Sequence, residues 1–142
     1  MNFLLDTNVV SEPVRPRPDA AVIRWLAEAD EDRLYLSVLT LSEIAQGVET
    51  MPEGRRKAAL QAWLEGELPG RFQSRLLAVD QAVAFAWGKL MGRAAKKGIA
   101  LGVMDGFFAA TALVFDLTLV TRNVPHFEKL EIKLLNPWNS TS

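Results

Sequence analysis

Four polar residues, each placed just after an apolar segment, have the types and spacing to take part in one reaction. They are Asp6, Glu43, Asp105 and Asn123. Carboxylates that a fold brings together raise one another's pKa unless a cation neutralises them. Hard divalent ions such as Mg²⁺ or Mn²⁺ prefer oxygen ligands, and they activate a bound water and stabilise charge on a phosphate. The pattern therefore predicts a Mg²⁺ or Mn²⁺ site that needs no nucleophile from the protein.

Each of the three acids also has a structural explanation. Asp6 can cap a helix after a strand, and Glu43 follows Thr40 by three residues, which is the spacing of a capping box. Asp105 can cap its own helix, but it interrupts the apolar stretch 103–108, where an acid without a partner is costly to bury. Asp105 is therefore the acid for which a structural role alone is least convincing.

Apolar periodicity and turn residues predict the elements that must position these side chains. Short apolar runs predict strands over residues 3–5, 34–38, 75–79, 118–121 and 132–135. Helical patterns cover residues 19–28, 40–48, 53–66, 80–97 and 103–115, with a turn or short helix over 123–127. Asp19 and Asp80 are expected as helix caps, and Pro69-Gly70 is expected to end the third helix. The helix over 103–115 is apolar nearly all round and should be buried.

Strands that alternate with helices predict an α/β fold of three layers, α/β/α, with a central, mainly parallel sheet of four to five strands. Ligands bind such sheets at the carboxyl ends of the strands, so Asp6 and Asn123 should face one crevice. The 142 residues suffice for one sizeable core, and we expect a single domain over 1–142. Residues 139–142 are expected to form a flexible tail.

The composition limits the chemistry and the location. The chain has no cysteine, which excludes disulfides, thiol catalysis and Cys-ligated zinc, and leaves oxygen ligands or His126 for a metal. Neither a signal-peptide core nor an apolar run of about 20 residues is present, so we expect a soluble, cytoplasmic protein without membrane contact. The net charge of −1 gives no general attraction for nucleic acid. Basic groups occur locally, at Arg15 and Arg17, at 55–57, and at Arg93, Lys96 and Lys97.

Four segments resemble, in order, the motifs of PIN-domain proteins, most closely the VapC toxins of type II toxin–antitoxin systems in the subgroup that includes FitB. They are Leu4–Glu12, Leu39–Gly47, Met104–Ala112 and Leu119–Phe127. The resemblance implies a PIN-like domain with the activity of a Mg²⁺-dependent endoribonuclease. It also implies that a cognate VapB-like antitoxin holds this activity in check.

The same resemblance assigns roles to individual residues. Asp6, Glu43 and Asp105 match the family's first three metal-binding acids, and Asn123 stands at a fourth position that is often acidic. An amide supplies no negative charge, so the number of metal ions, one or two, stays open. His126 is expected to be a surface or packing residue. The hydroxyls of Thr7 and Thr121 can orient waters or acids, or bond to nearby backbone.

The partners that the resemblance implies are an RNA substrate, tRNA among the candidates, the antitoxin, and a second copy of the chain in a homodimer. Promoter DNA would be bound only through the antitoxin complex. Five apolar residues are expected either to form a groove for an antitoxin helix or to be ordinary core. They are Trp25, Leu26, Leu60, Trp63 and Leu64.

Other folds and functions fit less well. A haloacid-dehalogenase-like phosphatase needs a second Asp two positions after the first, where this chain has Asn8. A receiver-like phosphoacceptor domain needs an acidic pair near the first strand and a Lys after a late strand, but Arg122 follows Thr121. Two alternatives stay open: a catalytically degenerate PIN fold that only binds a partner, which Asn123 favours, and an RNA-processing nuclease outside a toxin–antitoxin pair.

Overall fold

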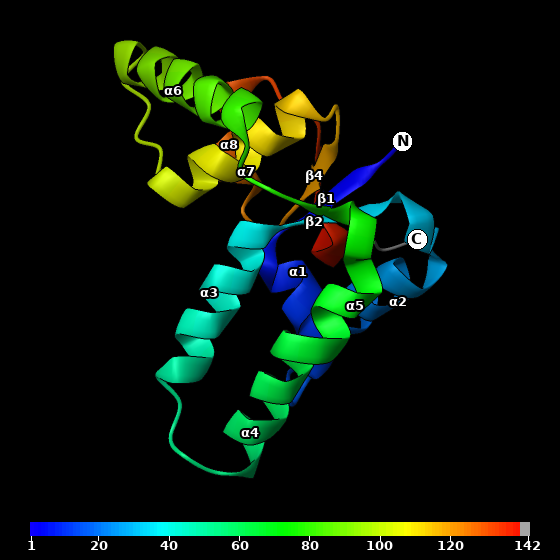
Figure 1. The fold of residues 1–142 in the computed structure, drawn as a ribbon. Helices are drawn as coiled ribbons and strands as arrows, with labels where there is room; N and C mark the ends of the chain where they lie inside the picture. The colour runs from blue at the N-terminus through cyan, green and yellow to red at the C-terminus, as the bar shows by residue number, and fades with distance from the viewer. Residues whose placement is uncertain (140–142) are drawn as a thin grey trace.

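A five-stranded parallel sheet forms the centre of the computed structural model, which describes residues 1–139 (Figure 1). The strands are β1 (Phe3–Leu5), β2 (Leu34–Ser37), β3 (Leu76–Leu77), β4 (Thr118–Val120) and β5 (Leu134–Leu135). Their order is β3-β2-β1-β4-β5, so β1 lies in the middle, where Leu4 pairs with Tyr35 and Leu119. The predicted α/β class and parallel sheet are confirmed, although β3 and β5 are shorter than expected. Residue 139 ends a short helical turn, and the rest of the expected tail, 140–142, lies outside the described residues.

Helices cover both faces of this sheet. One set comprises α1 (Thr7–Ser11), α2 (Ala20–Glu28), α3 (Val38–Glu49), α4 (Arg55–Ala62) and α5 (Leu68–Phe72), and the other comprises α6 (Gln81–Lys96), α7 (Val103–Val114) and α8 (Val124–Phe127). Shorter helical segments are η1 (Glu12–Val14), η2 (Glu31–Arg33), η3 (Trp63–Glu67), η4 (Gln73–Arg75), η5 (Glu128–Leu130) and η6 (Pro137–Asn139). Among the described residues, none of these helices combines the length and apolar character needed to cross a membrane.

The core consists of two clusters separated by the sheet. Successive side chains of a strand point to opposite faces, so Leu5 of β1 joins one cluster and Leu4 joins the other. The first cluster includes Val22 of α2 and Phe72 of α5, and the second includes Phe108 of α7. This division confirms the predicted three layers.

The helix that Pro69-Gly70 was expected to end continues through these residues. A π-helical segment, η3, joins α4 to α5, and the N–H of Leu68 bonds to the carbonyl of Trp63, five residues back. Proline has no N–H to donate and disturbs a helix least in its first turn, and Pro69 lies in the first turn of α5 directly after the π turn. The π turn thus explains why the prediction of a break was wrong.

Helix α3 begins two residues earlier than predicted. Ser37 ends β2 and caps α3 by accepting a hydrogen bond from the Leu39 N–H at 3.1 Å. The predicted capping box of Thr40 and Glu43 is therefore wrong, because the cap position is already filled and Thr40 is buried inside the helix. The predicted caps at the starts of α2 and α6 are confirmed: Asp19 accepts from the N–H groups of Ala21 and Val22, and Asp80 accepts from Val83.

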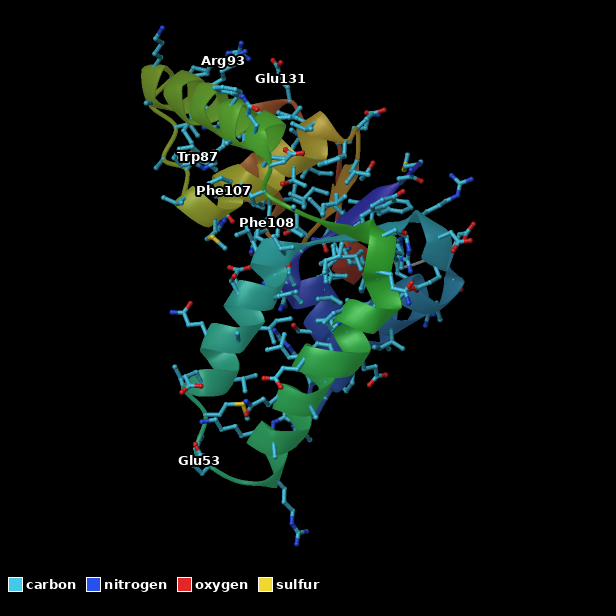
Figure 2. All side chains as sticks on the ribbon, in the orientation of Figure 1. Glu53, Trp87, Arg93, Phe107, Phe108 and Glu131 are labelled. Carbon is cyan, nitrogen blue, oxygen red and sulfur yellow. The ribbon has the colours of Figure 1, made fainter. Side chains whose placement is uncertain are left out.

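Helix α7 is buried around its middle but not at its ends, so the prediction of full burial is wrong in part. Residues 108–112 are all buried, and Phe108 belongs to the second cluster, whereas Val103 and Leu113 near the two ends are 58% and 47% exposed. The rings of Trp87 and Phe107 stack between α6 and α7 with centroids 4.9 Å apart (Figure 2). A Cβ atom at Gly106 would lie 2.6 Å from the Met91 sulfur, so glycine permits this close approach. Helix α6 thereby holds the first turn of α7, which carries Asp105.

Candidate active site

Asp6 lies at the junction of β1 and α1, at the middle of the sheet's carboxyl edge. Its backbone N–H donates to the carbonyl of Val120, and its Oδ2 accepts a hydrogen bond of 2.7 Å from the Thr121 hydroxyl. Burial raises the pKa of Asp6 above its ordinary value, Thr121 opposes this effect, and the negative charge of Asp105 adds to it. Asp6 is therefore a partly buried carboxylate held in place by the neighbouring strand.

Glu43 reaches the same edge from α3. The hydroxyl of Thr7, in the first turn of α1, donates to Glu43 Oε1 and lies 3.2 Å from the Thr40 hydroxyl. Burial raises the pKa of Glu43, the bond from Thr7 lowers it, and the charges of Asp6 and Asp105 raise it again. With its capping role excluded, Glu43 is free to act in the site.

Asp105 enters from the opposite set of helices, in the first turn of α7. Its Oδ2 lies 3.4 Å from Nδ1 of His126 on α8, and both residues line a cavity of about 360 Å³. The side chain of His126 is 58% exposed, as expected for a surface residue, but its contact with Asp105 was not predicted. The sequence feature that could have indicated this contact is the place of His126 in the short helix that follows Asn123.

Asn123 is linked to Asp6 through one hydroxyl group. The backbone N–H of Asn123 donates to Thr121 Oγ1 at 3.0 Å, and the same hydroxyl donates to Asp6. Asp6 and the backbone of Asn123 thus lie close together at the carboxyl ends of β1 and β4, with the Thr121 hydroxyl between them. Both threonines that the sequence analysis named, Thr7 and Thr121, hold an acid of the cluster.

The three acids Asp6, Glu43 and Asp105, here called the carboxylate cluster, lie close enough to raise the pKa of two of them by mutual repulsion. In residues 1–139, no group of three acidic or imidazole side chains is drawn together as tightly as the ligands of a metal ion. The donors are nevertheless all oxygens, and their repulsion is of the kind that a divalent cation relieves. The residues present therefore fit Mg²⁺ or Mn²⁺.

Replacing Thr121 with Val should destabilise the protein more at pH 8 than at pH 4. The substitution keeps the shape but removes the donor to Asp6, so the pKa of Asp6 rises further and its ionised form becomes costlier in the folded state. It also leaves the partly buried N–H of Asn123 without this acceptor, a loss of about 1 kcal/mol. Urea unfolding at both pH values measures the difference. Thr121→Ser is the control, and an equal pH dependence of both variants would contradict this role.

Comparison with known proteins identifies the family. A family model for the PIN domain matches residues 3–132. The toxin FitB of Neisseria gonorrhoeae is 36% identical over 137 residues, which cover 96% of this chain and 99% of FitB. The VapC ribonuclease Y4jK of Sinorhizobium fredii is 36% identical over 136 residues, which cover 96% of this chain and 97% of that protein.

Solved structures agree with the sequence relatives. A chain in the crystal structure of FitAcB from N. gonorrhoeae matches with a TM-score of 0.91 and 36% identity, over 96% of this chain and 99% of that chain. A chain of VapBC2 from Rickettsia felis, bound to a DNA fragment from its promoter, matches with a TM-score of 0.76 and 26% identity, over 96% and 98%. This chain therefore belongs to the PIN-domain family, in the group that contains FitB and the VapC ribonucleases.

Proposed function

We propose that this protein is a Mg²⁺- or Mn²⁺-dependent endoribonuclease and the toxin of a VapBC-type toxin–antitoxin module. The observation that carries the proposal is the carboxylate cluster, in which Asp6 after β1, Glu43 of α3 and Asp105 of α7 converge at the carboxyl edge of a parallel sheet. Burial and the charge of Asp105 raise the pKa of both Asp6 and Glu43. Membership of the group that contains VapC ribonucleases supports the choice of RNA as substrate.

The roles of the residues follow from their contacts. Asp6, Glu43 and Asp105 would hold the cation, which when bound activates water and offsets charge on the phosphodiester. Thr121 and Thr7 fix the orientations of Asp6 and Glu43 through their hydroxyls. Asn123 would add a neutral amide oxygen beside these acids, so the proposed site has three carboxylates and would hold one ion tightly instead of two.

The proposed antitoxin site is a groove between α1, α3 and α4, here called the α1/α4 groove. It comprises two adjoining cavities of about 530 and 240 Å³ that share Val14, Arg56, Leu60 and Trp63. The larger extends along α4, and the smaller reaches Glu43. An apolar helix face laid here would cover the approach to the carboxylate cluster.

The five apolar residues that the sequence suggested as either antitoxin groove or ordinary core fall into both groups. Leu64 is buried in the core, and Trp25 and Leu26 pack against the same cluster. Leu60 lines the groove, and Trp63 both lines it and packs against the core. The DNA-bound VapBC2 complex supports the further proposal that this chain reaches promoter DNA only through its antitoxin.

We propose that the outer surface of α6 and α7 forms the interface of the homodimer. This surface exposes large apolar side chains that belong to neither core cluster: Phe85, Val103, Leu113 and Phe115. Exposed apolar side chains on adjacent helices are typical of a protein–protein contact. The surface belongs to the layer opposite the α1/α4 groove, so both partners can bind at once.

Cleavage of total RNA and of purified tRNA tests the proposed function. The wild-type protein should cleave at least one of these substrates with Mg²⁺ or Mn²⁺, lose this activity with EDTA, and regain it when either ion is added in excess. A peptide from the C-terminal half of the protein encoded next to this gene should inhibit cleavage. Cleavage that persists in EDTA would contradict metal dependence. A complete lack of cleavage in the presence of both ions would favour the degenerate PIN fold.

A further inference from the structure

The negative net charge leaves open how this protein attracts RNA to a cluster of three carboxylates. Most nucleic-acid affinity comes from contacts between cations and phosphates. Of the basic groups at 55–57, Lys57 is engaged within the protein: its Nζ lies 2.7 Å from Glu53 Oε1 and 3.3 Å from the Glu49 carbonyl. Arg71 and Arg75 pair with Glu31. These cations are therefore not the ones that serve the site.

Two arginines line the part of the α1/α4 groove that reaches the carboxylate cluster. Arg15 and Arg56 share the cavity of about 240 Å³ with Thr7 and Glu43. Arg15 Nη2 donates to Asn8 Oδ1 at 3.3 Å, and Arg56 Nη2 donates to the carbonyl of Val14 at 3.4 Å. A guanidinium has five N–H donors, so a single hydrogen bond in each case leaves other donors of both side chains for a ligand.

Arg15 lies beside a buried carboxylate, that of Glu12. The Glu12 side chain is only 5% exposed, its Oε1 accepts the Asp19 N–H at 3.0 Å, and its Oε2 lies 3.6 Å from Arg15 Nε. Within the described part of the chain, Oε2 has no hydrogen-bond partner. A buried carboxylate with an incomplete set of partners costs stability, and a role in placing Arg15 would account for this cost.

We propose that Arg15 and Arg56 bind a phosphate of the RNA strand beside the carboxylate cluster, and that Glu12 is a positioning residue for Arg15. The inference rests on the proposed ribonuclease function and adds the path of the substrate. The strand then enters along the α1/α4 groove, on the Glu43 side of the site. The antitoxin and the RNA therefore compete for one surface.

The binding of a fluorescent single-stranded oligoribonucleotide, followed by anisotropy with Mg²⁺ present, tests this path. Every form carries Asp105→Asn, so that cleavage does not interfere. Arg15→Gln and Arg56→Gln should each weaken binding about tenfold or more. Each should also lower the steepness of log K against log salt by about 0.7, the value for one phosphate on a single strand. Arg24→Gln, an exposed arginine on α2, is the matched control and should change neither quantity.

A double-mutant cycle tests the part played by Glu12. Glu12→Gln should weaken RNA binding when Arg15 is present and have no further effect in the Arg15→Gln background. A merely structural role would weaken binding equally in both backgrounds. Arg15→Lys, which keeps the charge but loses the planar fork, should bind with intermediate affinity.

The other outcomes overturn the inference in distinguishable ways. Normal RNA binding by Arg15→Gln and Arg56→Gln, with a loss in Lys129→Gln, would place the strand in the cavity beside Asp105 and His126. A loss of antitoxin-peptide binding without a loss of RNA binding would assign the arginines to the protein partner. A complete absence of RNA binding, with both arginines intact, would overturn the proposed function itself.

Discussion

Asp6→Asn and Asp105→Asn should each lower the rate of RNA cleavage by about a hundred- to a thousandfold while the fold stays intact. Each substitution removes a charge that the proposed cation needs. Because burial and Asp105 both raise the pKa of Asp6, its ionised form is a cost to the folded protein. The metal-free Asp6→Asn variant should therefore be at least as stable as the wild type at pH 8. Loss of activity together with unchanged or higher stability separates a catalytic role from a structural one.

The control for these variants is Asp116→Asn. Asp116 is an acid on the surface, where it pairs with Lys133, and its backbone has a positive φ of 53° that asparagine tolerates. The same chemical change there should leave cleavage unaltered. Initial rates on a labelled RNA and urea unfolding curves give the two quantities. Wild-type rates from Asp6→Asn and Asp105→Asn would overturn the assignment of the site.

Mg²⁺ or Mn²⁺ should stabilise the wild-type protein by about 5–10 °C at pH 8 and by little at pH 4. The pKa values of Asp6 and Glu43 are raised in the folded state above the ordinary values of 3.8 and 4.5. The folded state then holds protons that the unfolded state has lost, so metal-free stability falls as pH rises from about 4 through the raised pKa values. A cation at about a hundred times its Kd adds about 2.7 kcal/mol, which gives a shift of this size for a domain of this length.

Thermal unfolding followed by circular dichroism measures this effect, with NaCl at matched ionic strength as the control. The gain should largely disappear in Asp6→Asn and in Asp105→Asn. An equal gain in these variants, or from the monovalent salt, would mean that the ions act elsewhere on the surface. A metal-free stability that rises between pH 5 and pH 8 would contradict the raised pKa values.

The sequence was sufficient where a local pattern determines local structure. The apolar run before Asp6 predicted strand β1, and Asp19 and Asp80 were recognised as caps because a carboxylate before a helical pattern can satisfy free N–H groups. The closeness of Asp6 and Asn123 at the ends of β1 and β4 followed from the rule that parallel strands present their carboxyl ends at one edge. These inferences need no knowledge of distant contacts.

The sequence was insufficient where a distant contact decides between two local solutions. Ser37 and Thr40 are both able to cap α3, and no local rule distinguishes them. The outcome follows from the packing of Thr40 against Thr7, 33 residues away, and from the bond that Thr7 makes to Glu43. The contact between His126 and Asp105 likewise depends on how α7 and α8 meet, which periodicity does not encode.

The position of β1 in the middle of the sheet has a consequence for how the protein is made. Asp6 is synthesised 115 residues before its side-chain partner, Thr121, and almost as long before its backbone partner, Val120. Strand β1 has β2 as its only neighbour until β4 has been translated. A nascent chain therefore has no complete carboxylate cluster until α7 has been translated, and Asp6 gains the hydroxyl that orients it only when Thr121 follows.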